Sequence, residues 1–190
     1  MSIVKTVREE DATGEVAKIY GEDIEEIGYV PSHTRVMALN PQAVRAFEGL
    51  VRTIALPLGK RNYELVTLAA ARGLRSQHCL LAHGRKSLAI FAEPDLIRIA
   101  EDYHDAGLTE AEVTMMEYAE KVSTASSAMT DADSRRLRDV GFSDADIVNI
   151  TLAAAVRNYY SRAIQALAVD VDVPAELSPG LKDALVGSLQ

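Results

Sequence analysis

The chain has 190 residues, of which 48% are hydrophobic, and its formal net charge is −8. The acidic balance argues against nucleic acid and against an anionic membrane surface as partners, because both attract basic proteins. No apolar run approaches the ~18 residues of a membrane span, and residues 1–11 lack the apolar core of a signal peptide. We therefore expect a cytoplasmic protein, folded as a single domain over residues 1–190.

Helical periodicity dominates the sequence, and alternating strand patterns are nearly absent. Taken in chain order, helices are predicted over residues 15–27, 40–56, 61–74 and 77–91, from 93, over 109–123, from 130, and over 143–169. The short loops between them are typical of a compact bundle. The tail after Asp170 contains proline and glycine, and we expect it to pack on a neighbouring subunit or to fray.

Polar residues mark where several of these helices begin. Asn40 followed by Pro41 combines a capping side chain with a proline at the first helical position. Thr109 and Glu112 have the spacing of a capping box. Both patterns support an all-α fold.

One short sequence occurs twice. Residues 67–71 and 151–155 both read Thr-Leu-Ala-Ala-Ala, each inside a predicted helix. We interpret the match as a pseudo-repeat of helical hairpins, with a motif hairpin at 61–91 and its echo at 143–169. Alanine is common in helices, so a chance match is the alternative.

The single cysteine, Cys79, is the centre of the most informative segment. One cysteine excludes an internal disulfide and a cysteine-rich zinc site. Ser76 stands three residues earlier as a plausible N-cap, which puts Cys79 in the first turn, where N–H groups and the helix dipole stabilise a thiolate. His83, four residues later, shares a helix face with Cys79 and can take or return its proton.

Glu64 lies on the preceding predicted helix. If the two helices form a hairpin, its carboxylate could orient an imidazole. The alternatives are that Glu64 is a solvated surface residue and that Cys79, next to Leu80 and Leu81, is inert core. His78 and His83 are five residues apart and face different sides of a helix, so no metal site is expected. No phosphate-binding loop or dinucleotide fingerprint indicates a cofactor.

Other polar residues are given structural roles. We expect His33 to lie in a loop, either exposed or structural. Arg157 and Arg162 are expected to anchor their helix through ion pairs, with binding of a substrate carboxylate as the minor alternative. Tyr159 and Tyr160 either line a pocket or simply pack.

The segment from Glu64 to His83 resembles the signature of the AhpD-like, carboxymuconolactone decarboxylase superfamily. That signature is a glutamate, then a CxxC near a helix start, then a histidine four residues after the second cysteine. Glu64, Cys79 and His83 match it, and His78 has a counterpart in the peroxide-reducing members. Further stretches that are similar to the peroxidase-related branch extend the resemblance over roughly residues 10–175: 28–31 with 40–41, 108–121, 137–144 and 157–162.

The resemblance implies an all-α, AhpD-like multi-helix bundle that assembles as a homo-oligomer. It implies a thiol-dependent peroxidase-like oxidoreductase, without cofactor or metal, whose catalytic residues are Cys79, His83, Glu64, Ser76 and His78. Cys79 matches the cysteine that peroxide oxidises in the peroxide-reducing members. The substrate would then be a hydroperoxide.

The chain departs from the family at Ser76, which stands where the first cysteine belongs. Because serine cannot close a disulfide, the oxidised Cys79 would need an external thiol to re-reduce it. Two other functions stay open. One is a carboxymuconolactone decarboxylase-type lyase that uses Glu64 and His83 as acid and base. The other is a non-catalytic helical oligomer with a buried, unreactive Cys79.

Overall fold

The computed structural model of the chain describes residues 2–189, without the side chain of Ser188. Over these residues the secondary structure is helical and contains no strand, so the all-α prediction is confirmed. The helices, in chain order, are η1 (Glu9–Asp11), α1 (Gly14–Ile27), α2 (Ser32–Met37), α3 (Pro41–Gly73), α4 (Gln77–Ser87), α5 (Glu93–Asp102), η2 (Tyr103–Asp105), α6 (Glu110–Ala125), η3 (Ser126–Ala128), α7 (Asp131–Asp139), α8 (Asp144–Ala166), α9 (Pro179–Val186) and η4 (Gly187–Leu189). None of the described helices is both long and apolar enough to cross a membrane.

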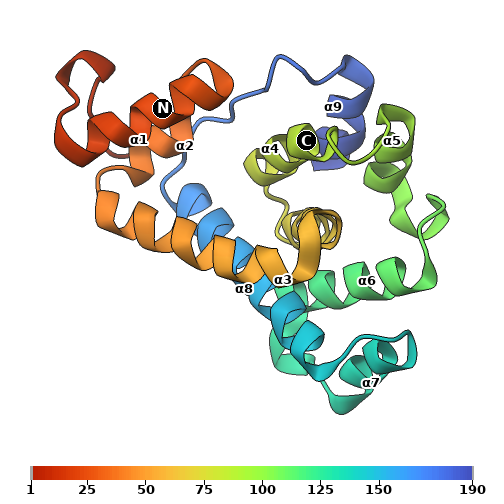
Figure 1. Cartoon of the computed structure of the whole chain (residues 1–190). Coiled ribbons are helices and arrows are strands. Elements are labelled where there is room, and N and C mark those ends of the chain that lie inside the picture. Colours follow the sequence, from red (N-terminus) through yellow and green to blue (C-terminus); the bar gives the residue numbers. More distant parts are fainter. Residues whose placement is uncertain (1, 190) are drawn as a thin grey trace.

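The second half of α3 forms the middle of the molecule. Figure 1 shows this half, in yellow, nearly end on and surrounded by α4, α6 and α8, and all three helices contact α3. Every residue from Tyr63 to Ala71 is buried. A helix enclosed on all sides has no solvent face, which explains why this stretch is apolar nearly all round. The core therefore fixes the position of Glu64, which lies in this buried run.

The first half of α3 points in a different direction from the second. The sequence predicts two helices separated at Pro57–Gly59, and the structure joins them without a loop. Gly59 has φ 73° and ψ 154°, a non-helical conformation that lacks the steric cost of a side chain. Pro57, two residues earlier, cannot donate a backbone hydrogen bond to the preceding turn. The resulting kink turns the orange half of α3 toward α1 (Figure 1).

The predicted caps are present. The Asn40 side chain accepts a hydrogen bond from the Ala43 N–H at the start of α3. Thr109 and Glu112 form the capping box of α6. Similar boxes begin α7 at Thr130 and α8 at Ser143.

The C-terminal tail forms a helix that packs on its own chain, so the expectation that it frays is wrong, while its contact with a neighbouring subunit stays a prediction. Its helix α9 contacts α4 and α5, and Leu181 is fully buried on it. Gly84 of α4 makes the close approach possible, because a Cβ there would lie 2.4 Å from Leu185 Cδ1. Burial of this apolar face outweighs the turn-rich composition that favoured fraying.

The two Thr-Leu-Ala-Ala-Ala segments lie on α3 and α8, which pack against each other. Ala69 and Ala70 of the first segment and Ala153 and Ala154 of the second are fully buried. Short side chains at such a contact let the two backbones come close. The single-domain assignment and the pseudo-repeat of hairpins stay predictions.

Candidate active site

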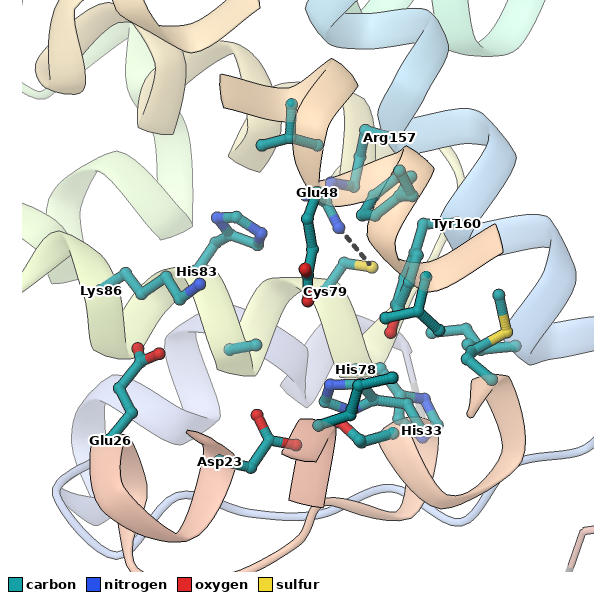
Figure 2. A pocket seen from close by; sticks show the side chains of 18 of the residues that line it. Asp23, Glu26, His33, Glu48, His78, Cys79, His83, Lys86, Arg157 and Tyr160 are labelled. Atoms are coloured by element: carbon teal, nitrogen blue, oxygen red, sulfur yellow. Dashed lines mark hydrogen bonds between the residues drawn. The ribbon is translucent and has the colours of Figure 1, made fainter. Parts of the chain in front are cut away.

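A cavity of about 740 Å³ lies between α1, α2, α4, α8 and both halves of α3. Its volume is within the ~300–1,000 Å³ typical of small-molecule sites. Four of the five predicted catalytic residues line it: Glu64, His78, Cys79 and His83. Figure 2 labels the last three of these. Ser76 is not among the lining residues.

Cys79 is the third residue of α4, so its sulfur lies in the first turn of that helix. The side chain is only 3% exposed. Its Sγ lies 3.1 Å from the Ser161 hydroxyl oxygen and 3.5 Å from Nη1 of Arg157, the contact drawn as a dashed line in Figure 2. The sulfur therefore lies between a guanidinium N–H donor and a hydroxyl group that can donate or accept, surroundings that are typical of reactive cysteines.

Arg157 is the residue that sequence reasoning placed wrongly. The expected ion pair does not form with any described carboxylate, and the side chain is only 5% exposed on α8. One guanidinium N–H group faces the Cys79 sulfur, while the Nε atom is buried without a hydrogen-bond partner. A buried cation without a counter-ion is costly. Arg157 is therefore a buried cation without a counter-ion, and it lies next to Cys79.

Glu64 and His83 form a buried pair. His83 Nδ1 lies 2.6 Å from a Glu64 carboxylate oxygen, and both side chains are less than 10% exposed. We assign the proton to Nδ1, which donates to the carboxylate and leaves the Nε2 lone pair free. Burial, together with the charge of Arg157, lowers the pKa of His83 to about 4, although Glu64 pulls it upward. At neutral pH His83 is thus an uncharged base.

The free energy of unfolding is expected to fall as the pH drops from about 6.5 to about 4. An unfolded imidazole binds a proton near 6.5, whereas folded His83 resists protonation until about 4. Between these values the unfolded chain holds more protons, so acid favours unfolding, by on the order of 1–3 kcal/mol. Urea titrations between pH 7 and pH 4 would measure the slope. His83→Gln should reduce the slope without abolishing it, because buried His33 contributes in the same direction, and an unchanged slope in that variant would contradict the assignment.

Ser76 occupies the N-cap position of α4, but its side chain makes no capping hydrogen bond. The predicted capping role is therefore wrong. Ser76 Oγ is instead buried without a hydrogen-bond partner.

Two further histidines lie at the cavity. His78 Nε2 donates to the backbone carbonyl of Asp170, 2.5 Å away, which ties the start of α4 to the C-terminal segment. His33 lies on α2 and not in the predicted loop. Burial, with a contribution from nearby His78, lowers the pKa of His33 to about 4. Its ring meets Tyr160 edge-on at 5.8 Å between centroids.

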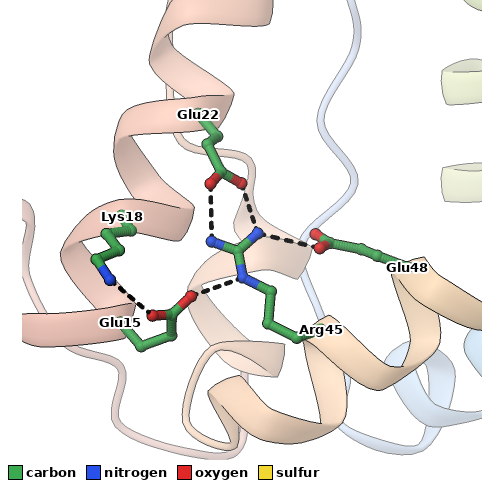
Figure 3. Close-up of polar contacts among 5 residues, drawn as sticks. All are labelled: Glu15, Lys18, Glu22, Arg45 and Glu48. Atoms are coloured by element: carbon green, nitrogen blue, oxygen red, sulfur yellow. Dashed lines mark hydrogen bonds and ion pairs between the residues drawn. The ribbon is translucent and has the colours of Figure 1, made fainter.

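An ion-pair cluster holds α1 against α3 at the rim of the cavity (Figure 3). Arg45 of α3 donates to Glu15 at 2.7 Å, to both oxygens of Glu22 at 2.5 and 2.8 Å, and to Glu48 at 3.0 Å. Glu22, Arg45 and Glu48 all line the cavity. Arg45 and Lys18 face three carboxylates, so the cluster keeps a net negative charge while it ties α1 to α3.

Comparison with known proteins gives no match to a family model and none to a curated protein. Solved structures do match. An uncharacterised peroxidase-related protein with an alkylhydroperoxidase AhpD core, from Ralstonia eutropha JMP134, is 24% identical with a TM-score of 0.78, over 90% of this chain and 92% of that one. A peroxidase-related protein from Silicibacter sp. TM1040 is 25% identical with a TM-score of 0.76, over 90% and 95%.

A third structure is the debrominase Bmp8, a variant in complex with 2,3,4-tribromopyrrole. It is 14% identical with a TM-score of 0.77, and the match covers 100% of both chains. At that identity it shares the fold alone. In its fold and in the Glu64, Cys79 and His83 pattern, the chain is similar to AhpD-like proteins of the peroxidase-related branch.

Proposed function

We propose that the protein is a thiol-dependent oxidoreductase that reduces hydroperoxides with Cys79 as its only redox-active group. One observation carries the proposal. The Cys79 sulfur lies at a small-molecule cavity between the buried Arg157 cation and the Ser161 hydroxyl. Inert core cysteines lack such surroundings, which resemble those of reactive thiols.

The first step forms the nucleophile. The Cys79 thiol gives its proton through a water molecule to the neutral His83 imidazole, one helical turn further along α4, because the two side chains share no direct hydrogen bond. Glu64 stabilises the imidazolium that results, since the carboxylate is already bonded to Nδ1. Arg157 stabilises the thiolate.

The second step transfers oxygen. The thiolate attacks the terminal oxygen of the hydroperoxide, so that the S–O bond forms and the O–O bond breaks. Sulfur is oxidised to sulfenic acid, and the peroxide is reduced to an alcohol, whose oxygen takes back the proton from His83. Two buried donors without partners, Arg157 Nε and the Tyr63 hydroxyl, lie on the same cavity and can bind the developing alkoxide.

The structural neighbours support the coarser part of the proposal. Two are described as peroxidase-related proteins, and the debrominase complex contains a small aromatic molecule. A small-molecule substrate agrees with the size of the cavity. The choice of a hydroperoxide rests on the Cys79 surroundings and on the sequence resemblance.

Mass spectrometry of the intact protein would test the oxidation step. After exposure to an alkyl hydroperoxide in the absence of thiols, we expect Cys79 to gain one oxygen atom and to react with a sulfenic-acid trap. Because methionine can also gain an oxygen atom, the Cys79→Ala variant is treated in the same way as a control for oxidation elsewhere in the chain. An unmodified Cys79 after peroxide exposure of the folded protein would overturn the proposal.

A lyase that uses acid–base chemistry is the second candidate. Its support is the buried Glu64–His83 pair, which holds a neutral imidazole toward the cavity whether or not sulfur takes part. The non-catalytic alternative agrees with the 3% exposure of Cys79. It leaves unexplained why a buried cation faces that sulfur.

The predicted homo-oligomer has a candidate interface on α3 and α8. An apolar groove there is lined by exposed or half-buried side chains that include Leu50, Leu152 and Tyr159. Exposed apolar surface of this kind is typical of protein–protein contacts. We propose this face for self-association, and sedimentation of Leu50→Glu against wild type would measure it.

A further inference from the structure

We propose that the thiol that re-reduces Cys79 is a small zwitterion, with an ammonium and a carboxylate group near its sulfur, as in an amino-acid thiol. This inference rests on the proposed function. It concerns the second half-reaction, in which sulfenic acid returns to thiol. The chain has no second cysteine to reduce the sulfenic acid, and a folded protein dithiol cannot reach the buried sulfur.

The resolving sulfur must come from outside, because Cys79 is the only cysteine in the chain. It must also reach a sulfur that is only 3% exposed. The cysteines of a dithiol protein lie on a folded surface and cannot approach a sulfur that other side chains cover. A cavity of about 740 Å³ has room for a small thiol beside Cys79.

The charged groups of the cavity indicate what that thiol carries. Arg45 already satisfies Glu22 and Glu48, and Glu26 forms an ion pair with Arg85. Besides Arg157, the charged lining residues that form no ion pair with a described residue are Arg52, which is exposed, and Asp23 and Lys86. Asp23 and Lys86 both face the cavity in Figure 2.

Asp23 has one carboxylate oxygen, Oδ2, that is buried without a hydrogen-bond partner. Lys86 makes no ion pair with any described carboxylate. Lys86 is exposed, so its ammonium is solvated and available at the cavity. The buried Asp23 oxygen can accept from the ammonium of a zwitterion, and Lys86 can pair with its carboxylate. Deeper in the cavity, Arg157 is 5% exposed and its Nε atom also lacks a partner. The Nη1 atom of the same guanidinium lies 3.5 Å from Cys79 Sγ and can donate to the sulfenic oxygen.

The chemistry balances with two thiols. The first attacks the Cys79 sulfur, forming an S–S bond while the S–O bond breaks, and the oxygen leaves as water with the thiol proton. The second attacks the small thiol's sulfur in this mixed disulfide. It releases the symmetric small-molecule disulfide and returns Cys79 to its thiol state.

Steady-state peroxide reduction with four reductants would test the proposal: free L-cysteine, cysteamine, 3-mercaptopropionate and a thioredoxin-type dithiol protein. Cysteamine lacks the carboxylate and 3-mercaptopropionate lacks the ammonium. We expect L-cysteine to have the lowest KM, by about tenfold over either single-charge thiol, since each lost charge-assisted contact weakens binding by about that factor. The dithiol protein should be inactive.

Two variants assign the contacts. Lys86→Met should raise the KM of L-cysteine and 3-mercaptopropionate but not of cysteamine. Asp23→Asn should raise the KM of L-cysteine and cysteamine but not of 3-mercaptopropionate. Lys60→Met, at an exposed position that does not line the cavity, is the matched control.

The outcomes separate the two proposals. Oxidation of Cys79 by peroxide is measured without any thiol, so its absence overturns the proposed function itself. Oxidation followed by re-reduction only by the dithiol protein overturns this inference and leaves the proposed function intact. Equal KM values for all three small thiols, unaffected by Lys86→Met and Asp23→Asn, would also overturn it.

Discussion

When Cys79 is replaced by alanine, the rate of peroxide consumption is expected to fall to the rate measured in buffer without protein. The proposed cycle forms and breaks every bond at that sulfur, and the chain has no second thiol to substitute for it. Cys79→Ser should be equally inactive, because a hydroxyl is not oxidised by peroxide. The change is small in volume, and circular dichroism of both variants would verify that the helices remain. A peroxide-sensitive dye assay would measure the rate.

The acid–base alternative gives the opposite pattern. A lyase that relies on Glu64 and His83 would keep its activity in Cys79→Ser and lose it in His83→Ala. Comparing these two variants therefore distinguishes the two reactions in one experiment. Peroxide consumption at the wild-type rate in Cys79→Ala would end the thiol proposal.

Replacing Arg157 by methionine is expected to slow the oxidation of Cys79 by about 10²–10³-fold. The guanidinium lies 3.5 Å from the sulfur, where it stabilises the thiolate, and its free Nε can bind the oxygen that develops charge. Loss of one such preorganised donor typically costs a factor of this size. Stopped-flow measurement of the second-order rate with excess peroxide would give the value.

Two controls separate this effect from general disruption. Methionine fills similar volume without charge, and removing a buried cation that lacks a counter-ion should not destabilise the fold. Arg162→Met changes an exposed arginine on the same helix and should react at the wild-type rate. Arg157→Lys should recover part of the rate, since it restores charge without the planar donors. A wild-type rate of Cys79 oxidation in Arg157→Met would show that Arg157 does not contribute to the reaction.

Much of the fold follows from local sequence. Helix starts at Pro41, Glu110 and Asp144 agree with the predicted starts to within a residue, because capping side chains act within one turn. The C-terminal tail could not be predicted in this way. Its helix is stabilised by contacts with α4 and α5, which lie far from it in sequence.

The candidate site likewise contains one relation that local sequence predicts and others that depend on tertiary packing. The relation between Cys79 and His83 is one turn of a single helix, and spacing alone suggests it. The contacts of Cys79 with Arg157 and Ser161 span 78 and 82 residues, so only the packing of α8 against the other helices creates them. One local signal was present: Arg157 and Ser161 are four residues apart and share a face of α8.

The most direct test of the central claim is the rate at which an alkylating reagent modifies Cys79 in the folded protein at neutral pH, followed by intact mass. A sulfur that lines an open cavity beside a cation should be alkylated rapidly, and Arg157→Met should slow the reaction. A sulfur that stays unmodified until the protein is unfolded in urea would contradict the claim that Cys79 is the reactive group.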